Sequence, residues 1–301
     1  AKIATADGWY DCEMNMEQNR RIRLWYGNEQ HFGKVGNPQR DVNITGTIAD
    51  IDAVVGCSYR LNDHKALPFS VGPDLKRLCA PGDFNIDIDR GLLQPGENRL
   101  TISIHYRGDK TITGECIIVY YNDRRWPLPC EIDWKKVGRI TDAVQVVDGR
   151  WKLEADGIRT VDPWYDRMVA IGDESWCDYE IEVTAIFHSF RPPSDEPPCY
   201  GVTHAAIALR WPGHDRDKLQ PYVKWYPLGA SCEYTLSENL KNCSWRIICE
   251  PGMCCDTPVR SQDIVLGRRY KMKARVVSEK NKGARYRAKL WLSNSREPAG
   301  W

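Results

Sequence analysis

The 301-residue chain lacks several features that define common protein classes. No apolar run approaches the roughly 20 residues of a membrane-spanning helix, so no membrane span is expected. The formal net charge is only +1, which excludes the strong overall field that draws a protein to nucleic acid. The chain also has no Gly-rich phosphate loop, no serine or cysteine nucleophile motif and no nucleic-acid module. We therefore expect no nucleic-acid partner, and no complete catalytic motif is present.

Closely spaced cysteine pairs of the Cys-x-x-Cys type are missing as well, although the chain has 12 cysteines. Structural zinc sites usually show such pairs, so no metal site is assigned. Two interpretations remain: disulfides formed in an oxidising compartment, which we favour, and scattered buried thiols. The predicted disulfide cysteines are Cys12, Cys57, Cys79, Cys116, Cys130, Cys177, Cys199, Cys232, Cys243, Cys249, Cys254 and Cys255.

Two N-glycosylation sequons, at Asn43 and Asn242, agree with a secreted or cell-surface protein. Asn43 is expected to be the better acceptor, because it alternates away from Val42 and Ile44 in a predicted strand and would then face solvent. Asn242 precedes Cys243, whose disulfide would compete with glycosylation.

The length predicts two domains, and the pattern predicts an all-β fold. In residues 1–123, short strands recur with Gly- and Pro-containing turns between them, which is typical of an antiparallel sandwich. Residues 124–136 form a predicted linker, stiffened by its prolines. Five cysteines precede about residue 135 and seven follow it. If all of them pair, at least one disulfide crosses this boundary, and Cys130 is the natural donor.

The first segment resembles immunoglobulin-like modules of extracellular proteins, which implies an immunoglobulin-like β-sandwich. The residues that carry this resemblance are Ser58-Tyr59-Arg60-Leu61-Asn62, Gly82-Asp83-Phe84-Asn85 and Leu93-Gln94-Pro95-Gly96-Glu97-Asn98. The Cys…Trp…Cys arrangement of antibody domains is not evident, so analogies with antigen receptors do not transfer.

Residues 137–301 resemble the concanavalin A-like lectin/glucanase superfamily, including laminin-G-like modules. The carriers are residues 167–173, Trp176-x-Asp178-Tyr179, and the closing strands 270–276 and 286–291. The resemblance implies a jelly-roll sandwich, a fold that hosts lectins, hydrolases, lyases and adhesion modules. Residues 230–262, with five cysteines, depart from the usual pattern and are interpreted as a disulfide-tied insertion.

A candidate ligand-binding patch lies on two predicted strands and their turn in residues 200–226. Aromatic rings stack on the apolar faces of sugars, and Arg and Lys donate hydrogen bonds to hydroxyls. A polysaccharide lyase would also use a Tyr or His base with a cation, but the motifs of alginate-lyase relatives are missing. Ordinary sheet packing is the alternative. The patch residues are Arg210, Tyr222, Lys224, Tyr226, His204 and His214.

A second candidate surface is basic. Alternation in the two closing strands would place five cations and a tryptophan on one face, where they suit the carboxylates or sulfates of acidic glycans. The alternative is an ordinary polar outer face of a half-buried sheet. The residues are Lys271, Lys273, Arg275, Arg287, Lys289 and Trp291.

Carboxylates give weaker signals. Asp178, Glu180 and Glu182 would share a strand face, but laminarinase-type glucanases carry Glu-x-Asp-x-Glu, and the order here is Asp-x-Glu-x-Glu. We interpret them as a solvated face and assign no catalytic residue.

Asp83 and its neighbours Asp87 and Asp89 could suggest calcium, which laminin-G-like modules often bind, but they lack a compact ligand loop. No cofactor is otherwise expected.

The sequence thus predicts a secreted, disulfide-bonded, non-catalytic protein that binds a polysaccharide or glycoprotein glycan, or assembles with copies of itself as a surface or adhesion module. One alternative is a polysaccharide lyase or glycoside hydrolase of the jelly-roll type. The other is a subunit of an extracellular fibre, which would use tryptophans and strand edges for its contacts.

Overall fold

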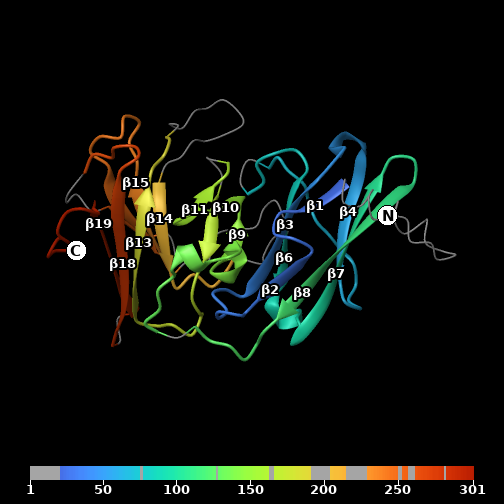
Figure 1. The fold of residues 1–301 in the computed structure, drawn as a ribbon, viewed down its shortest axis with the longest axis horizontal. Coiled ribbons are helices and arrows are strands. Elements are labelled where there is room, and N and C mark those ends of the chain that lie inside the picture. The colour runs from blue at the N-terminus through green and yellow to red at the C-terminus, as the bar shows by residue number, and fades with distance from the viewer. Residues whose placement is uncertain are drawn as a thin grey trace. The chain divides into compact units, whose positions relative to one another are not determined.

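The structure is a computed structural model that describes residues 21–74, 77–126, 128–162, 166–190, 204–214, 229–249, 253–256, 262–280 and 283–301. Within these ranges the chain is all-β, and its helices are four single 3-10 turns. The described residues form two compact units, one of residues 21–162 and 166–172 and the other of the residues from 173 onward (Figure 1). Residues 137–172, expected in the second domain, therefore belong to the first unit where they are described.

The first unit contains two packed sheets. The smaller sheet has the strand order β1 (Ile22–Leu24), β3 (Asp41–Ile48), β6 (Asp83–Asp89). The larger sheet has the order β2 (Glu29–Phe32), β8 (Lys110–Tyr120), β7 (Gly96–Tyr106), β4 (Val54–Leu61), β5 (Leu67–Pro68). All pairs are antiparallel except β2 with β8. These two sheets form an all-β sandwich around one apolar core.

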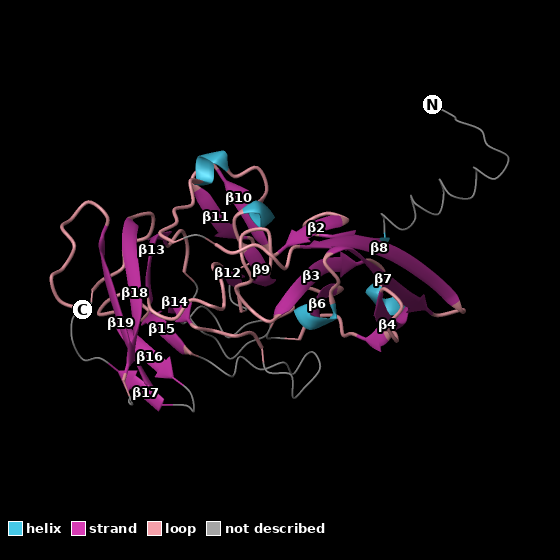
Figure 2. Cartoon of the chain, turned by 90° about the horizontal axis from the view of Figure 1, so that it is seen from below, coloured by secondary structure: helices cyan, strands magenta, loops and turns pink. Residues whose placement is uncertain are grey.

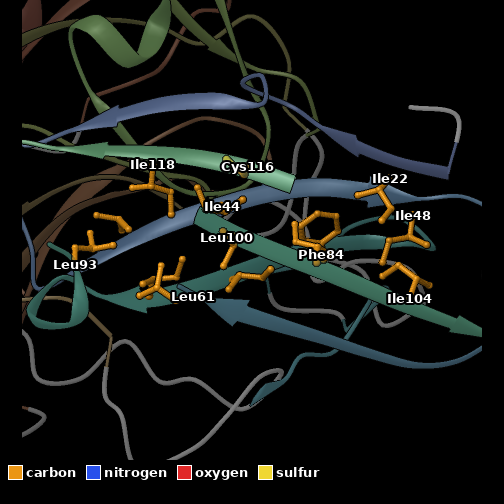
Figure 3. Packing of buried hydrophobic residues seen from close by; sticks show 14 of the residues in the cluster. Ile22, Ile44, Ile48, Leu61, Phe84, Leu93, Leu100, Ile104, Cys116 and Ile118 are labelled. Atoms are coloured by element: carbon orange, nitrogen blue, oxygen red, sulfur yellow. The ribbon is translucent and has the colours of Figure 1, made fainter. Parts of the chain in front are cut away.

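Alternation along the strands builds the core between these sheets (Figure 3). Ile44 and Ile48 of β3 point inward, and so does Phe84 of β6. From the larger sheet, Leu100 of β7 and Ile118 of β8 meet them. All five side chains are almost fully inaccessible to solvent. Isoleucine suits this position because its branched side chain packs well on a pleated surface.

The rest of the first unit consists of short elements around a second, small apolar cluster. Strand β9 (Gln145–Asp148) pairs with β12 (Met168–Ala170), and β10 (Trp151–Glu154) forms a hairpin with β11 (Gly157–Thr160). The four 3-10 turns are η1 (Ile51–Ala53), η2 (Arg90–Leu92), η3 (Trp134–Lys136) and η4 (Ile140–Asp142).

The second unit is a sandwich of a three-stranded and a four-stranded sheet (Figure 2). The three-stranded sheet has the order β13 (Tyr179–Ile186), β18 (Arg269–Glu279), β19 (Gly283–Leu292). The other has the order β14 (His204–Leu209), β15 (Ala230–Thr235), β16 (Ser244–Cys249), β17 (Met253–Asp256). Tyr234 and Trp245 fill the core from one sheet, and Tyr270 and Met272 fill it from the other.

The segment 230–262 is therefore not an insertion. It supplies β15, β16 and β17, three of the four strands of one sheet. The cysteines that suggested an insertion partly serve as small apolar core residues, since Cys232 and Cys243 are buried in the sandwich.

The predicted disulfides are not seen among the described side chains. Cys12 and Cys199 lie outside the described residues, and so do the side chains of Cys254 and Cys255. Cys57 and Cys116 lie on strands separated by β7, opposite Ile104 and Leu100, so they cannot meet. Cys130 has an exposed free thiol within the first unit and forms no bridge. The free thiols are those of Cys57, Cys79, Cys116, Cys130, Cys177, Cys232 and Cys243.

Within the described ranges, no helix is both long enough and apolar enough to cross a membrane.

Candidate functional site

The outer face of the three-stranded sheet β13–β18–β19 gathers the predicted basic residues. The strand register aligns them in three rows: Glu180–Arg275–Arg287, Glu182–Lys273–Lys289 and Thr184–Lys271–Trp291. The alternate residues Tyr270, Met272, Ala274 and Val276 of β18 point into the core. Burial of that apolar face fixes the register and so aligns the polar face. We call the nine aligned residues the grid.

The acids of β13 neutralise the cations of β18. Lys271 Nζ lies 2.9 Å from a carboxylate oxygen of Glu182, and Arg275 Nε lies 2.7 Å from one of Glu180. Lys273 contacts both acids, at 3.0 Å and 3.4 Å. Opposite charges directly across neighbouring strands stabilise a sheet. This half of the grid is therefore a mixed polar surface rather than a basic one.

These ion pairs shift the pKa values of the groups involved. The hydrogen bond from Lys271, together with that from Lys273, lowers the pKa of Glu182 against the opposing effect of burial. Burial alone would lower the pKa of Lys273, but hydrogen bonds to Glu297 and Glu182 outweigh it and raise that pKa. Glu182 and Lys273 are consequently both charged at neutral pH.

The cations of β19 depend on a different partner, the segment 293–301, which folds back over the grid. Lys289 Nζ lies 2.5 Å from Glu297 Oε1 and donates a hydrogen bond to the Pro298 carbonyl at 3.0 Å. Lys273 Nζ lies 3.0 Å from each carboxylate oxygen of Glu297. Arg287 forms no ion pair with any described residue and is half-buried. The β19 side is thus the positive side of the grid.

Two tryptophans border the same cations. Lys273 Nζ and Lys289 Nζ lie 5.7 and 5.8 Å from the centre of the Trp291 ring. Lys289 Nζ also lies 4.5 Å from the Trp301 ring, and Arg275 Cζ lies 4.8 Å from it. Such distances allow cation–π attraction. Trp291 is buried, whereas Trp301 is 38% exposed.

The other predicted patch is not assembled by the described residues. Tyr222, Lys224 and Tyr226 lie outside them. Strand β14 ends at Leu209, and Arg210 then adopts a left-handed φ of 54°. His214 is buried beside Trp211, with ring centres 5.0 Å apart, while His204 is exposed. Arg210 and His214 therefore do not line one open strand face.

Arg210 instead ties the ends of β13 and β18 together. Its guanidinium donates hydrogen bonds to the Cys177 carbonyl at 2.8 Å, to Asp178 at 3.1 Å and to Ser278 Oγ at 2.7 Å. Its backbone N–H donates to the Tyr179 hydroxyl at 2.6 Å. Arg210 thus donates these hydrogen bonds inside the protein, which gives it a structural role, and a ligand-binding role stays a prediction.

In the first unit, Asn43 does not face solvent as expected. Its side chain is 3% exposed and donates hydrogen bonds to Asn85 at 3.0 Å and to Asp87 at 2.7 Å. Gln39 donates to its carbonyl oxygen at 2.8 Å. Alternation does direct Asn43 away from the sandwich core, but other residues of the unit cover that second face. A buried, hydrogen-bonded amide cannot accept a glycan in the folded protein.

The group that closes this buried layer is Arg77. Its guanidinium makes a bidentate pair with Asp87 at 2.8 and 2.9 Å and donates to Asp148 at 2.5 Å. Asp83 accepts hydrogen bonds from Thr47 and the Ala80 backbone. Asp83 and Asp87, two of the carboxylates considered as calcium ligands, are therefore engaged separately. The described residues contain no cluster of three or more metal-ligating side chains.

The second sequon has the geometry expected of an acceptor. Asn242 is exposed and left-handed, with φ 52°, in the turn before β16. Its neighbour Cys243 is a buried free thiol. The structure thus reverses the expected order of the two sequons, because the turn exposes Asn242 while the covered sheet buries Asn43.

Comparisons with known proteins add little to this geometry. No family model matches the chain, and no curated protein matches it. Among solved structures, the endo-beta-1,4-mannanase from Thermotoga petrophila is similar over 34% of this chain and 20% of that chain, with 13% identity and a TM-score of 0.26. The chain therefore spans about a fifth of that protein, and a likeness of this size carries no argument about fold or function.

The sequence did not predict two features of this site, the acids within the grid and the segment that covers it. It treated Glu180 and Glu182 separately from the basic residues, although their strand proves to be the neighbour of β18. It also gave no role to Glu297 and Trp301. The aligned alternation of Glu180/Glu182 against Lys273/Arg275 was the available signal for the first, but strand order does not follow from sequence order in a sandwich.

Proposed function

We propose that the protein is a non-catalytic extracellular glycan-binding module, and that the grid is its binding surface. The observation that carries the proposal is the β19 side of the grid. There, two cations, Arg287 and Lys289, alternate along one strand and lead to Trp291. Cations on alternate residues lie about 6.6–6.8 Å apart, so an extended chain of sugars running along β19 would meet several donors.

The chemistry of these groups suits a glycan. Arginine and lysine donate several hydrogen bonds to hydroxyls and form strong, charge-assisted bonds with carboxylates or sulfates.

The acids in and beside the grid support binding rather than catalysis. A glycosidase needs one carboxylic acid that keeps its proton near neutral pH, which requires a raised pKa. The pKa values of Glu182 and Glu297 are instead lowered by their lysine partners. Both carboxylates are therefore ionised and engaged, and they serve better as parts of a polar surface.

The extracellular assignment is supported by the exposed sequon at Asn242 and by the cysteine content. Disulfide pairing remains a prediction, and peptide mapping without reduction would test it. Unmodified thiols at Cys116 and Cys232 are compatible with the proposal, because both are buried in cores. Bridges involving the exposed Cys130 or Cys177 would support an oxidising compartment.

A glycan panel tests the function. The protein is titrated by calorimetry against neutral, carboxylated and sulfated polysaccharides, and the same mixtures are assayed for new reducing ends and for the ultraviolet absorbance of unsaturated products. The proposal predicts binding without either product, and weaker binding by Arg287→Ala. Product formation would replace it with the lyase or hydrolase alternative. Absence of binding to every glycan would overturn it.

A further inference from the structure

We infer that Glu297 is a built-in ligand of the grid, occupying a carboxylate site that an acidic glycan of the uronate class fills on binding. This inference rests on the proposed function and specifies its ligand. It also assigns a role to the segment 293–301, which competes with that ligand for the same two lysines.

Two lysines converge on the carboxylate of Glu297. The side chains of Lys273 and Lys289 are only 11% and 9% exposed, yet both ammonium groups reach Glu297 within 3.0 Å. An ammonium group that is largely removed from water needs a compensating anion. These two lysines therefore form a carboxylate site, which Glu297 fills in this structure.

The two lysines depend unequally on Glu297. Lys273 keeps Glu180 and Glu182 as partners when Glu297 leaves. Lys289 has Glu297 as its one carboxylate partner among the described residues, besides the Pro298 carbonyl on the same segment. Departure of the segment would leave Lys289 next to Arg287, which pairs with no acid among the described residues. The vacated site is thus positive and selects an anion.

The segment 293–301 is held mainly by contacts of side chains. Its backbone is tied at its start, where Ser293 N–H donates to the Arg269 carbonyl and Ser295 N–H to the Leu292 carbonyl. Among the described residues no backbone–backbone bond involves residues 296–301. Glu297 is exposed, although its carboxylate contacts the two lysines. The ring of Trp301 lies against Arg275 and Lys289. The segment can therefore be exchanged without breaking a strand ladder.

The bound segment also indicates what replaces it. It places one carboxylate between two ammonium groups and one flat ring over neighbouring cations. A uronate residue in a glycan offers the same pair of features, a carboxylate and a flat apolar ring face. A neutral sugar offers the ring alone and would leave Lys289 without an anion.

The test uses a galacturonic acid oligomer and its fully methyl-esterified counterpart, which has the same rings without the charges. Both are titrated into the whole parent chain, Glu297→Gln, Trp301→Ala and the control Glu238→Gln, whose carboxylate is exposed elsewhere in the second unit. Removing the competitor should tighten binding of the acid by about 5- to 100-fold in Glu297→Gln, from the strength of hydrogen bonds to charged groups. Trp301→Ala should act in the same direction, and Glu238→Gln should match the parent.

The outcomes separate this inference from the proposed function. Binding of the acid by the parent without any gain in Glu297→Gln or Trp301→Ala overturns the internal ligand and leaves the binding function standing. Equal gains for the acid and the ester overturn the carboxylate site. If neither oligomer nor any other glycan of the panel binds any of the chains, the proposed function itself falls. Urea unfolding of each variant confirms that it is folded.

Discussion

The side chain of Arg77 shows how a single residue closes the covered polar face of the first unit. It is 1% exposed and pairs with Asp87 and Asp148, of which Asp148 is fully buried. Burial alone would lower the pKa of Arg77, but the charges of Asp148 and Asp87 outweigh it and raise that pKa. Arg77 is thus a permanent charge that holds two acids inside the unit.

Replacing Arg77 by methionine should unfold the first unit more easily. The change keeps much of the volume but leaves two acids without their cation, which costs about 3–5 kcal/mol of the free energy of unfolding. Urea denaturation measures this loss. The control is Arg60→Met, at an exposed position of β4, which should stay close to the parent. Similar midpoints for Arg77→Met and Arg60→Met would contradict the structural role of the pair.

Glycosylation should occur at Asn242 and not at Asn43. The reason is accessibility, since Asn242 lies in an exposed turn and Asn43 inside the buried layer. Mass spectrometry of peptides from a eukaryotic secretory host would show one occupied site, and Asn242→Gln would remove the glycan. A glycan on Asn43 would mean that the buried layer is not formed when the sequon is recognised.

At the scale of the strand, one glycine allows β3 to lie between β1 and β6. A Cβ atom on Gly46 would meet the Arg23 carbonyl oxygen of β1 and come within 2.6 Å of the Phe84 ring of β6. Rigid backbone on one side and a buried ring on the other leave no room to adjust.

Gly46→Ala should therefore lower the free energy of unfolding by roughly 1–3 kcal/mol, the usual cost of overpacking a core. The matched control is Gly157→Ala, where the added Cβ atom meets nothing within 4 Å. Comparison of their urea midpoints checks the prediction. Equal effects of the two substitutions would show that β3 is not packed as described.

The ladder between β13 and β18 should weaken in acid. The pKa of Glu182 is lowered in the folded protein, so the unfolded chain binds more protons as the pH falls. The stability from this pair is complete above the ordinary pKa of about 4.3 and is lost as the pH falls through the lower, folded value. Urea midpoints measured from pH 6 down to pH 3 should fall less steeply for Glu182→Gln than for the parent. Parallel curves would contradict the pairing.

The strands also show which elements the sequence could predict. The sequence predicted the closing strands, 270–276 and 286–291, inside the observed bounds of β18 and β19, and it predicted a strand at Val42–Ile44, which lies in β3. It failed for β15, β16 and β17, because clustered cysteines favoured a tied insertion over the sheet they build. Alternation likewise showed that Asn43 points away from Val42 and Ile44. It could not show that Arg77 and Asp148, far away in sequence, cover the face on which Asn43 lies.

On the scale of the whole molecule, the division into two units was predicted but not its position. The prolines after residue 124 suggested a linker, whereas the first unit continues to residue 172. The reason is the small apolar cluster around Ile140 and Val146, which packs with Tyr26 from the start of the described chain. Such contacts join residues more than a hundred positions apart, and local patterns carry no information about them.

The binding surface illustrates the same limit. The sequence placed Lys271, Lys273, Arg275, Arg287, Lys289 and Trp291 on one face, and the strand register brings them together. It did not reveal that the acids of β13 pair with the cations of β18, or that Glu297 pairs with Lys289 of β19. The positive part of the surface is therefore smaller than predicted. Among the described residues, the grid cation without an ion pair is Arg287 on β19.

The central claim is that this face of the second unit binds a glycan, and titration of one double variant tests it most directly. Arg287→Ala combined with Lys289→Met removes both β19 cations, each able to contribute about 1.5–3 kcal/mol through charged hydrogen bonds. The account predicts that binding of the best ligand from the glycan panel weakens by at least about tenfold, whereas Arg60→Ala in the first unit binds like the parent. Parent-like affinity in a folded double variant would contradict the claim.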